Sequence, residues 1–167
     1  CREGSYSISL QSLPAGDNPI KAKIPVFLFT EAIDHGTEMT AKNAGVKNAD
    51  ALKVNIKYMI NYAGNCLTNQ HSDINKAHDI LSDESKCEFI LGVDTVMCDS
   101  LKYADIILPL TTEWERFDGL FGGTLGHKSN REMMVAYQQI IDPLYEAKSD
   151  QDIACELAEK LGIARAD

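Results

Sequence analysis

The stretch IKYMINYAGNCLTNQHSDINKAHDILSDESKCEFILGVD (56–94) decides the fold. Its two ends, 56–62 and 88–93, are short apolar runs that are typical of buried strands. Between them, apolar side chains recur at helical spacing over 73–81, and Ser72 is the expected N-cap of that helix. A strand, a helix and a second strand form a βαβ unit, so this stretch predicts a parallel sheet.

Strands and helices continue to alternate on both sides of this unit. The apolar run IPVFLF (24–29) predicts a strand before it, and 106–108 predicts a strand after it. A short helix is expected over 37–44, with Gly45 as its stop. A longer helix is expected near the end of the chain, and its first residue, apolar stripe and stop are Ser149, Ile153, Leu157, Leu161 and Gly162.

The remaining segments carry weaker signals. Residues 1–23 are polar and rich in Ser, Gly and Pro, which predicts a linker or extended lead-in before a domain over 24–167. Residues 118–131 are expected to form a Gly-rich loop, and 133–141 is β-like but ambiguous. Because open parallel sheets bind ligands beyond the carboxyl ends of their strands, function is sought in the residues that follow each strand.

Composition limits the classes of function. The chain has 167 residues and a mass of 18.4 kDa, enough for one domain with its own core. Its formal net charge is −9 and its lysines are scattered, so no nucleic-acid partner is expected. No apolar run approaches the roughly 18 residues of a membrane-spanning helix, so no direct membrane insertion is expected. The chain begins at Cys1 rather than Met, which predicts processing or a piece of a longer protein.

Cysteines and histidines form no recognisable metal or redox motif. The five cysteines include no pair three residues apart, and Cys87 and Cys155 are expected to pack among apolar neighbours. His71 and His78 could share a helix face, but no acid or cysteine completes a ligand set, so no metal site is assigned. The sequence also contains no G-x-S-x-G turn and no Cys/His pair in a recognisable context, and no catalytic residue is assigned.

Two familiar fingerprints are missing or incomplete. No strand runs into G-x-G-x-x-G, which weighs against an NAD site, and GHKS (126–129) misses the phosphate-binding P-loop by one residue. A signalling receiver domain needs an acid cluster after its first strand, for which Glu31 and Asp34 are a poor match. An NAD(P)-linked oxidoreductase domain and a non-enzymatic receiver-like signalling domain stay open as alternatives.

The loop after the strand at 56–62 has the composition of a ligand-binding turn. Gly64 permits close approach of the backbone, and the amides that follow could bind an anion such as a pyrophosphate. Asn65, Asn69 and Gln70 add hydrogen-bond donors and acceptors. A simple strand-to-helix turn is the alternative.

A second polar group follows the next two strands. Asp94 ends an apolar run, where it could accept hydrogen bonds from a ribose hydroxyl or a guanine edge; a helix N-cap is its alternative role. Asp105 is expected to have a structural role where the next strand begins.

Six stretches of the chain match one known pattern: IPVFLFTEAIDHG (24–36), NYAGNCLTNQHSDINKAHDIL (61–81), CEFILGVD (87–94), KYADIILP (102–109), TTEWERFD (111–118) and EAKSDQDIACELAEKLG (146–162). In this order and spacing they resemble the molybdopterin oxidoreductase family, and within it the catalytic A subunits of dimethyl sulfoxide reductases. The ADIILP block and the helix that begins at AKSD are specific as a pair.

The resemblance implies a three-layer, Rossmann-like, doubly wound α/β domain with a mostly parallel sheet, internal to a larger catalytic subunit. In the family this domain holds the guanosine diphosphate end of a molybdopterin guanine dinucleotide. Cys66 stands where many relatives have proline, and a plain surface cation is the alternative role of Arg116. The resemblance implies these cofactor-binding residues: Gly64, Asn65, Gln70, Asp94, Arg116 and Asp150.

The family's iron–sulfur cysteine motif and its molybdenum-ligating residue match nothing in this chain, which implies that other segments of the parent protein ligate both. The parent reaction is expected to be a two-electron oxygen-atom transfer that reduces an S- or N-oxide, and this chain alone is expected to be inactive. The expected partners are the parent's other domains, an iron–sulfur electron-transfer subunit and a membrane anchor. The parent is expected in a prokaryote, in a membrane-associated complex or the periplasm, although this chain carries no targeting signal.

Overall fold

The computed structural model describes residues 19–117 and 138–163. The chain divides into two compact units, Asn18–Pro109 and Leu110–Asp167, the second together with Cys1–Asp17. Each unit is described by itself. The lead-in expected over 1–23 and the Gly-rich loop expected over 118–131 lie almost entirely outside the described residues.

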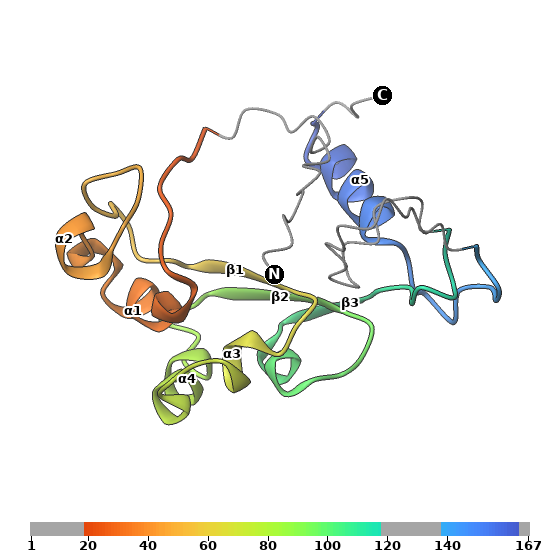
Figure 1. Ribbon diagram of the computed structural model, residues 1–167, viewed down its shortest axis with the longest axis horizontal. Helices are drawn as coiled ribbons and strands as arrows, with labels where there is room; N and C mark the ends of the chain where they lie inside the picture. The colour runs from red at the N-terminus through yellow and green to blue at the C-terminus, as the bar shows by residue number, and fades with distance from the viewer. Residues whose placement is uncertain (1–18, 118–137, 164–167) are drawn as a thin grey trace, which may run out of the picture. The chain divides into compact units, whose positions relative to one another are not determined.

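A parallel sheet organises the first unit, which confirms the predicted α/β class. Its strands are β1 (Tyr58–Tyr62), β2 (Phe89–Asp94) and β3 (Ile106–Pro109), in the spatial order β1-β2-β3 (Figure 1). Both pairings are parallel, and Leu91 of β2 lies between Ile60 and Ile106 in register. The βαβ unit read from the sequence is therefore present, with strand ends within two residues of those expected.

Short helices connect these strands. Between β1 and β2 run α3 (Cys66–Asn69) and α4 (Ile74–Leu81), and the 3-10 helix η3 (Asp99–Tyr103) connects β2 to β3. The helix α4 begins one residue later than predicted, because the Asp73 carboxylate, and not Ser72, accepts a hydrogen bond from the Lys76 amide at 3.1 Å.

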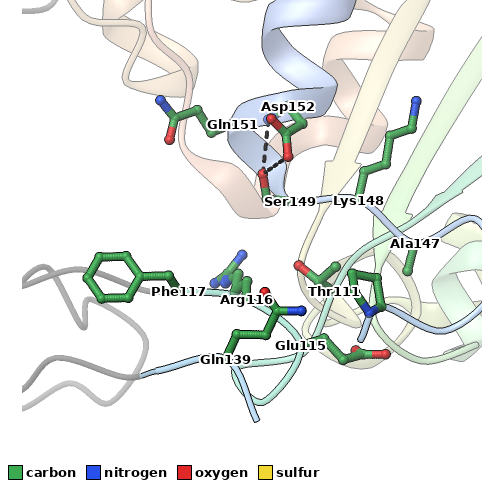
Figure 2. A pocket seen from close by; sticks show the side chains of 11 residues that line it. Thr111, Glu115, Arg116, Phe117, Gln139, Ala147, Lys148, Ser149, Gln151 and Asp152 are labelled. Atoms are coloured by element: carbon green, nitrogen blue, oxygen red, sulfur yellow. Dashed lines mark hydrogen bonds between the residues drawn. The ribbon is translucent and has the colours of Figure 1, made fainter. Parts of the chain in front are cut away.

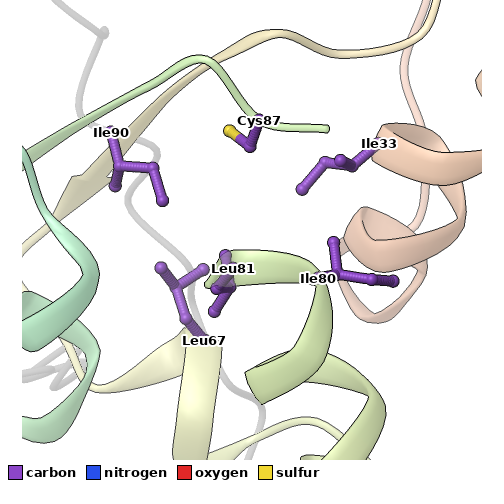
Figure 3. Close-up of a cluster of buried hydrophobic side chains, with 6 residues drawn as sticks. All are labelled: Ile33, Leu67, Ile80, Leu81, Cys87 and Ile90. Carbon is purple, nitrogen blue, oxygen red and sulfur yellow. The ribbon is translucent and has the colours of Figure 1, made fainter. Parts of the chain in front are cut away.

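The core of this unit lies between the sheet and the helices on one of its faces. Six buried side chains form it and point toward one another in Figure 3: Ile33, Leu67, Ile80, Leu81, Cys87 and Ile90. Cys87 packs as predicted, and burial raises the pKa of its thiol. Gly92 sets how closely η3 approaches β2, because a Cβ at this position would lie 2.5 Å from Leu101 Cδ2.

The strand predicted over 24–29 is wrong. The structure has the 3-10 helix η1 (Val26–Leu28) followed by α1 (Phe29–Asp34). A short continuous apolar run does not distinguish a buried strand from a buried helix. The segment is helical because Phe29, Ala32 and Ile33 are spaced i, i+3 and i+4. In a helix this spacing places all three side chains against apolar clusters.

The helix expected over 37–44 is present in two shorter pieces, η2 (Gly36–Glu38) and α2 (Ala41–Ala44). Thr40 and Asn43 form a capping box at the start of α2. Gly45 ends this helix as predicted, with a left-handed φ of 66° that favours glycine.

In the second unit, the predicted helix is present as α5 (Asp150–Lys160) and begins one residue later than predicted, with Ser149 as its N-cap. The Ser149 hydroxyl accepts a hydrogen bond from the Asp152 amide at 3.1 Å, and Gly162 follows the helix with a φ of 71°. Just before it, Lys148 forms a parallel bridge with Leu110. The described part of the ambiguous segment 133–141, residues 138–141, is not a strand. Cys155 on α5 is half-buried.

None of the helices in the described parts of the chain is both long and apolar enough to span a bilayer.

Candidate functional site

The carboxyl ends of β1 and β2 bring two of the predicted site residues into contact. Asp94 ends β2, and its Oδ2 accepts a hydrogen bond from the Gly64 amide at 3.0 Å. Its Oδ1 accepts one from the Thr95 amide at 2.6 Å. The half-buried carboxylate therefore ties the end of β2 to the loop after β1, at the edge where parallel sheets bind ligands.

Asn65 lies next to this contact and clamps α3 to η3. Its side-chain carbonyl accepts hydrogen bonds from the Ser100 amide at 2.9 Å, the Ser100 hydroxyl at 2.7 Å and the Thr68 hydroxyl at 2.9 Å. The Asn65 side-chain amide has no partner among the described residues, so it is the group of this side chain that can meet a ligand.

Ser100 completes the clamp, and sequence reasoning missed it. This fully buried hydroxyl also accepts from the Leu67 and Thr68 amides at 3.1 and 3.3 Å. The first-turn amides of α3 that were expected to face an anion are thus bonded to a side chain. No local signal identifies Ser100, because its partner Asn65 lies 35 residues away.

The left-handed residue of this loop is Ala63 and not the neighbouring Gly64. Ala63, with a φ of 45°, takes the left-handed conformation, and its amide donates to Val93 O at 2.8 Å. Gly64 has no positive φ; a Cβ there would lie 3.3 Å from Cys66 Sγ. Gly64 is therefore tight for packing reasons, while the sharp turn falls one residue earlier.

Gln70 is set apart from this group. It is the C-cap residue of α3, with its amide bonded to Cys66 O at 3.3 Å, and it is exposed. The structure assigns it no hydrogen bond to Gly64, Asn65 or Asp94 among the described residues.

The two remaining predicted residues, Arg116 and Asp150, meet in the second unit. Arg116 Nη1 lies 3.2 Å from Asp150 Oδ1, and that oxygen also accepts a hydrogen bond from the Gln151 amide at 3.0 Å. The Arg116 side chain is only 18% exposed, against 46% for Asp150, which disfavours the reading of Arg116 as a surface cation. Their pairing places a guanidinium at the amino end of α5.

A pocket of about 370 Å³ is lined in part by Arg116 (Figure 2). Its wall combines the loop after β3 with the start of α5: Thr111, Glu115, Arg116, Phe117, Gln139, Pro143, Ala147, Lys148, Ser149, Gln151 and Asp152. Cationic, amide, hydroxyl and carboxylate groups stand beside one exposed aromatic ring, Phe117. Such a wall can meet the phosphates, hydroxyls and base of a nucleotide.

Two further residues of this wall were missed by sequence reasoning. Glu115, 4% exposed, accepts from the Thr112 amide and hydroxyl at 2.7 Å each and from the Leu144 amide at 2.8 Å. These bonds, led by the one from the Thr112 amide, lower the pKa of Glu115 and fix the loop. Thr111 is equally buried, yet its hydroxyl has no hydrogen-bond partner among the residues that the structure describes. In Figure 2 that hydroxyl points into the space between Arg116 and Ser149.

The acids considered for a receiver domain are engaged elsewhere. Glu31 forms an ion pair with Lys76, and Asp34 forms one with Lys86 at 2.9 Å, which lowers the pKa of Asp34. Nε2 of His71 forms a hydrogen bond with the Thr30 hydroxyl at 3.0 Å. No group of three or more His, Cys, Asp or Glu side chains among the described residues could hold a metal ion.

The chain is similar to a known protein family and to several curated enzymes. A family model described as molybdopterin oxidoreductase matches residues 10–160. Dimethyl sulfoxide reductase DmsA of Escherichia coli (strain K12) is 45% identical over 162 residues, which are 97% of this chain and 20% of that protein. Trimethylamine-N-oxide reductase 1 of the same strain is 30% identical over 159 residues, 93% of this chain and 17% of that protein.

Among solved structures, acetylene hydratase from Pelobacter acetylenicus is similar with a TM-score of 0.55 at 21% identity, over 81% of this chain and 15% of that chain. This likeness supports the α/β fold alone. The chain spans about a fifth of the length of the curated relatives named here. Because the family model covers nearly its whole length, the chain belongs to the molybdopterin oxidoreductase family.

Proposed function

We propose that this chain is an internal cofactor-binding part of a larger molybdenum-dependent oxidoreductase subunit. Its role is to hold the guanosine diphosphate end of a molybdopterin guanine dinucleotide. The observation that carries the proposal is the pocket at the start of α5, where Arg116 and Asp150 meet beside the unpartnered, buried Thr111 hydroxyl. A buried hydroxyl without a partner is costly unless a ligand completes its hydrogen bonding.

The donor set of both sites fits this nucleotide. Carboxylates such as Asp94 and Asp150 accept hydrogen bonds from ribose hydroxyls and from the N–H groups of guanine. Arg116 donates to oxygen atoms of phosphate or base, and Phe117 offers a ring face for stacking. Gly64 and Asn65 would contact the ligand at the sheet edge, and Gln70 stays a weaker proposal since it lies apart.

The chemistry itself belongs to the cofactor, which supplies the two-electron redox centre when bound. The residues of this chain bind and orient it, and we assign none of them a catalytic role. Molybdenum and the iron–sulfur cluster are ligated by other segments in this proposal. The names of the relatives, which act on dimethyl sulfoxide and trimethylamine N-oxide, support reduction of an S- or N-oxide by oxygen-atom transfer.

The same relatives suggest the setting. We propose that the parent is a prokaryotic enzyme in a membrane-associated or periplasmic complex, with an iron–sulfur electron-transfer subunit and a membrane anchor as partners. The family assignment leaves neither the NAD(P)-linked domain nor the receiver-like domain with an observation in its favour.

Nucleotide content of the purified full-length polypeptide tests the proposal. Hydrolysis of the cofactor's pyrophosphate should release GMP in proportion to bound cofactor, measured by chromatography. Asp150→Asn should lower GMP at least several-fold, because it removes an acceptor at the pocket. Glu159→Gln, an exposed acid at the other end of α5, is the matched control and should not change it. Full GMP content in Asp150→Asn and in Asp94→Asn would refute the assignment.

A further inference from the structure

Two free thiols lie against the same glycine at the carboxyl ends of β1 and β2. Cys98 Sγ lies 3.9 Å from Gly64 O, where the thiol can donate a weak hydrogen bond. A Cβ placed on Gly64 would lie 3.3 Å from Cys66 Sγ. Both cysteines are half-buried, so small molecules in solvent can reach them. The two sulfur atoms are therefore neighbours of one residue, although they lie far apart in the sequence.

Hydrogen bonds beside the two cysteines hold their segments together. Asn65, which precedes Cys66, accepts from the Ser100 amide at 2.9 Å and from its hydroxyl at 2.7 Å. Leu67, which follows Cys66, donates its amide to the Ser100 hydroxyl at 3.1 Å. Because Ser100 lies two positions after Cys98, these bonds place α3 beside η3 (Figure 1). A disulfide joins cysteines whose Cα atoms lie within about 7 Å, so segments held this closely are the ones it can join.

The other described cysteines differ from this pair. Cys87 packs in the core, and burial raises the pKa of its thiol. Because the thiolate is the reactive form of cysteine, Cys87 is expected to be inert. Cys155 lies on α5 of the second unit and is half-buried, like Cys66 and Cys98. It provides a thiol of similar exposure at a different place in the chain.

We propose that Cys66 and Cys98 form a reversible disulfide that regulates the nucleotide site at the sheet edge. The identity of the ligand rests on the proposed function, whereas formation of the bond does not. Both sulfur atoms lie against Gly64, so a bond between them spans this residue. Gly64 is where the ligand approaches the backbone in the proposed function, next to its contact with Asp94. The reduced chain therefore admits the nucleotide, and the oxidised chain excludes it.

A small-molecule disulfide such as oxidised glutathione is the oxidant. The thiolate of one cysteine attacks it, which forms a mixed disulfide and releases one small thiol. The thiolate of the other cysteine then attacks the cysteine sulfur of the mixed disulfide, which forms the protein disulfide and releases a second small thiol. The two cysteines lose two protons and two electrons, and the two released thiols carry them away. A dithiol reverses both steps.

Peptide mapping of the full-length polypeptide tests whether the bond forms. After treatment with oxidised glutathione, alkylation of free thiols and digestion with trypsin, peptides 58–76 and 87–102 should be linked in most copies, with the loss of two hydrogen atoms. Fragmentation should assign the bond to Cys98 and find Cys87 alkylated. Dithiothreitol should release both peptides. Recovery of Cys66 and Cys98 only as alkylated or separately glutathionylated residues, or a bond from Cys66 to another cysteine, would overturn the proposal.

Comparison of cofactor-free and cofactor-loaded full-length polypeptide tests the regulation. Two events that exclude one another must do so equally in both directions, since coupling between sites is reciprocal. At a fixed ratio of reduced to oxidised glutathione, the linked fraction should therefore be several-fold smaller in the loaded polypeptide. Oxidised cofactor-free polypeptide should bind GDP several-fold more weakly in equilibrium dialysis and recover after dithiothreitol. Equal GDP binding before and after oxidation would contradict the inference.

Single substitutions separate this bond from general oxidation of the polypeptide. In Cys66→Ser and in Cys98→Ser, oxidised glutathione should leave GDP binding unchanged. In Cys155→Ser, the matched control on α5, it should weaken GDP binding as in the unchanged chain. Sensitivity that persists in both of the first two variants would refute the assignment. If either variant folds poorly, the peptide map of the unchanged polypeptide still decides whether the bond forms.

The inference and the proposed function fail in different ways. A reduced polypeptide that binds no GDP would refute the proposed nucleotide and its regulation, while linked peptides would still establish the bond. A polypeptide that binds GDP but forms no link between peptides 58–76 and 87–102 would overturn the inference alone.

Discussion

The sheet edge in the first unit and the pocket in the second differ in how far their polar groups satisfy one another. At the sheet edge, the Ser100 amide and hydroxyl both donate hydrogen bonds to Asn65 Oδ1, and the Ser100 hydroxyl accepts from two α3 amides. In the pocket, the Thr111 side chain is also buried, and its hydroxyl has no partner within the described parts of the chain. The first arrangement holds a loop in shape before any ligand arrives, whereas the second leaves a hydrogen bond for a ligand to make.

Removing the Ser100 hydroxyl from the sheet edge should have the largest effect on stability. Ser100→Ala leaves the Leu67 and Thr68 amides buried without their acceptor, which costs about 2 kcal/mol or more. Native-state hydrogen exchange of α3 should then accelerate roughly 30-fold, since 1.4 kcal/mol is about tenfold in an equilibrium constant. Ser85→Ala, at an exposed serine, should leave exchange in α3 unchanged. Unchanged exchange in Ser100→Ala would mean that Ser100 does not hold the loop.

Removing the Thr111 hydroxyl from the pocket should affect nucleotide binding and not stability. Thr111→Val replaces the unpartnered hydroxyl by a methyl group of similar size, so stability should stay within about 0.5 kcal/mol or rise. The same change should lower GMP content several-fold, because a hydrogen bond to the nucleotide is lost. Thr37→Val, at an exposed threonine, is the control for both readouts. Lower stability together with normal GMP content would show that Thr111 serves the fold and not the ligand.

Glu115 gives the pocket a pH dependence. Its pKa is lowered from the ordinary value of 4.5, so its stabilising contribution is present above that value and is lost as pH falls through the lowered one. Glu115→Gln should therefore be less stable than the unchanged chain at pH 7, with the difference shrinking as pH falls through the lowered pKa of Glu115. Fluorescence of Trp114, the single tryptophan of the 167 residues, reports unfolding of this loop. A difference that is constant with pH would contradict this assignment.

The smallest effect is expected in the turn that joins the sheet edge to its loop. Ala63→Gly relieves a left-handed alanine at a cost in chain entropy, so it should stabilise by a few tenths of a kcal/mol, on the order of what such changes give. Gly64→Ala should destabilise slightly, because its Cβ would lie 3.3 Å from Cys66 Sγ. Urea unfolding of the two variants measures both changes in the free energy of unfolding. The reverse order would place the strain at Gly64.

Structural features that depend on residues close together in the chain could be predicted from the sequence. The strands of the parallel sheet, the helix that begins at Ser149 and the stop at Gly45 all follow from local apolar spacing and capping. The segment 24–29 was misread because a six-residue apolar run suits a helix equally well. Its assignment depends on packing against α4, which is distant in sequence.

The candidate site could be predicted only in part, because its contacts join residues that are far apart in the sequence. Asp94 could be placed at a strand end by local pattern, and its contact with Gly64 follows from parallel pairing. Arg116 and Asp150 were each implied by the family resemblance, and their contact across 34 residues was not predicted. Ser100 and Thr111 have ordinary neighbours in sequence, and their importance arises from burial that only the folded chain creates.

Gly92 has a consequence for how this sheet can change over many generations. A Cβ there would lie 2.5 Å from Leu101 Cδ2 and 3.1 Å from Ala104 Cβ, so a neighbouring side chain must shift to admit even one carbon atom. A substitution at position 92 therefore requires Leu101 to move or to become smaller. The two positions should evolve as a linked pair, and the order of substitutions, rather than their sum, decides which descendants still fold.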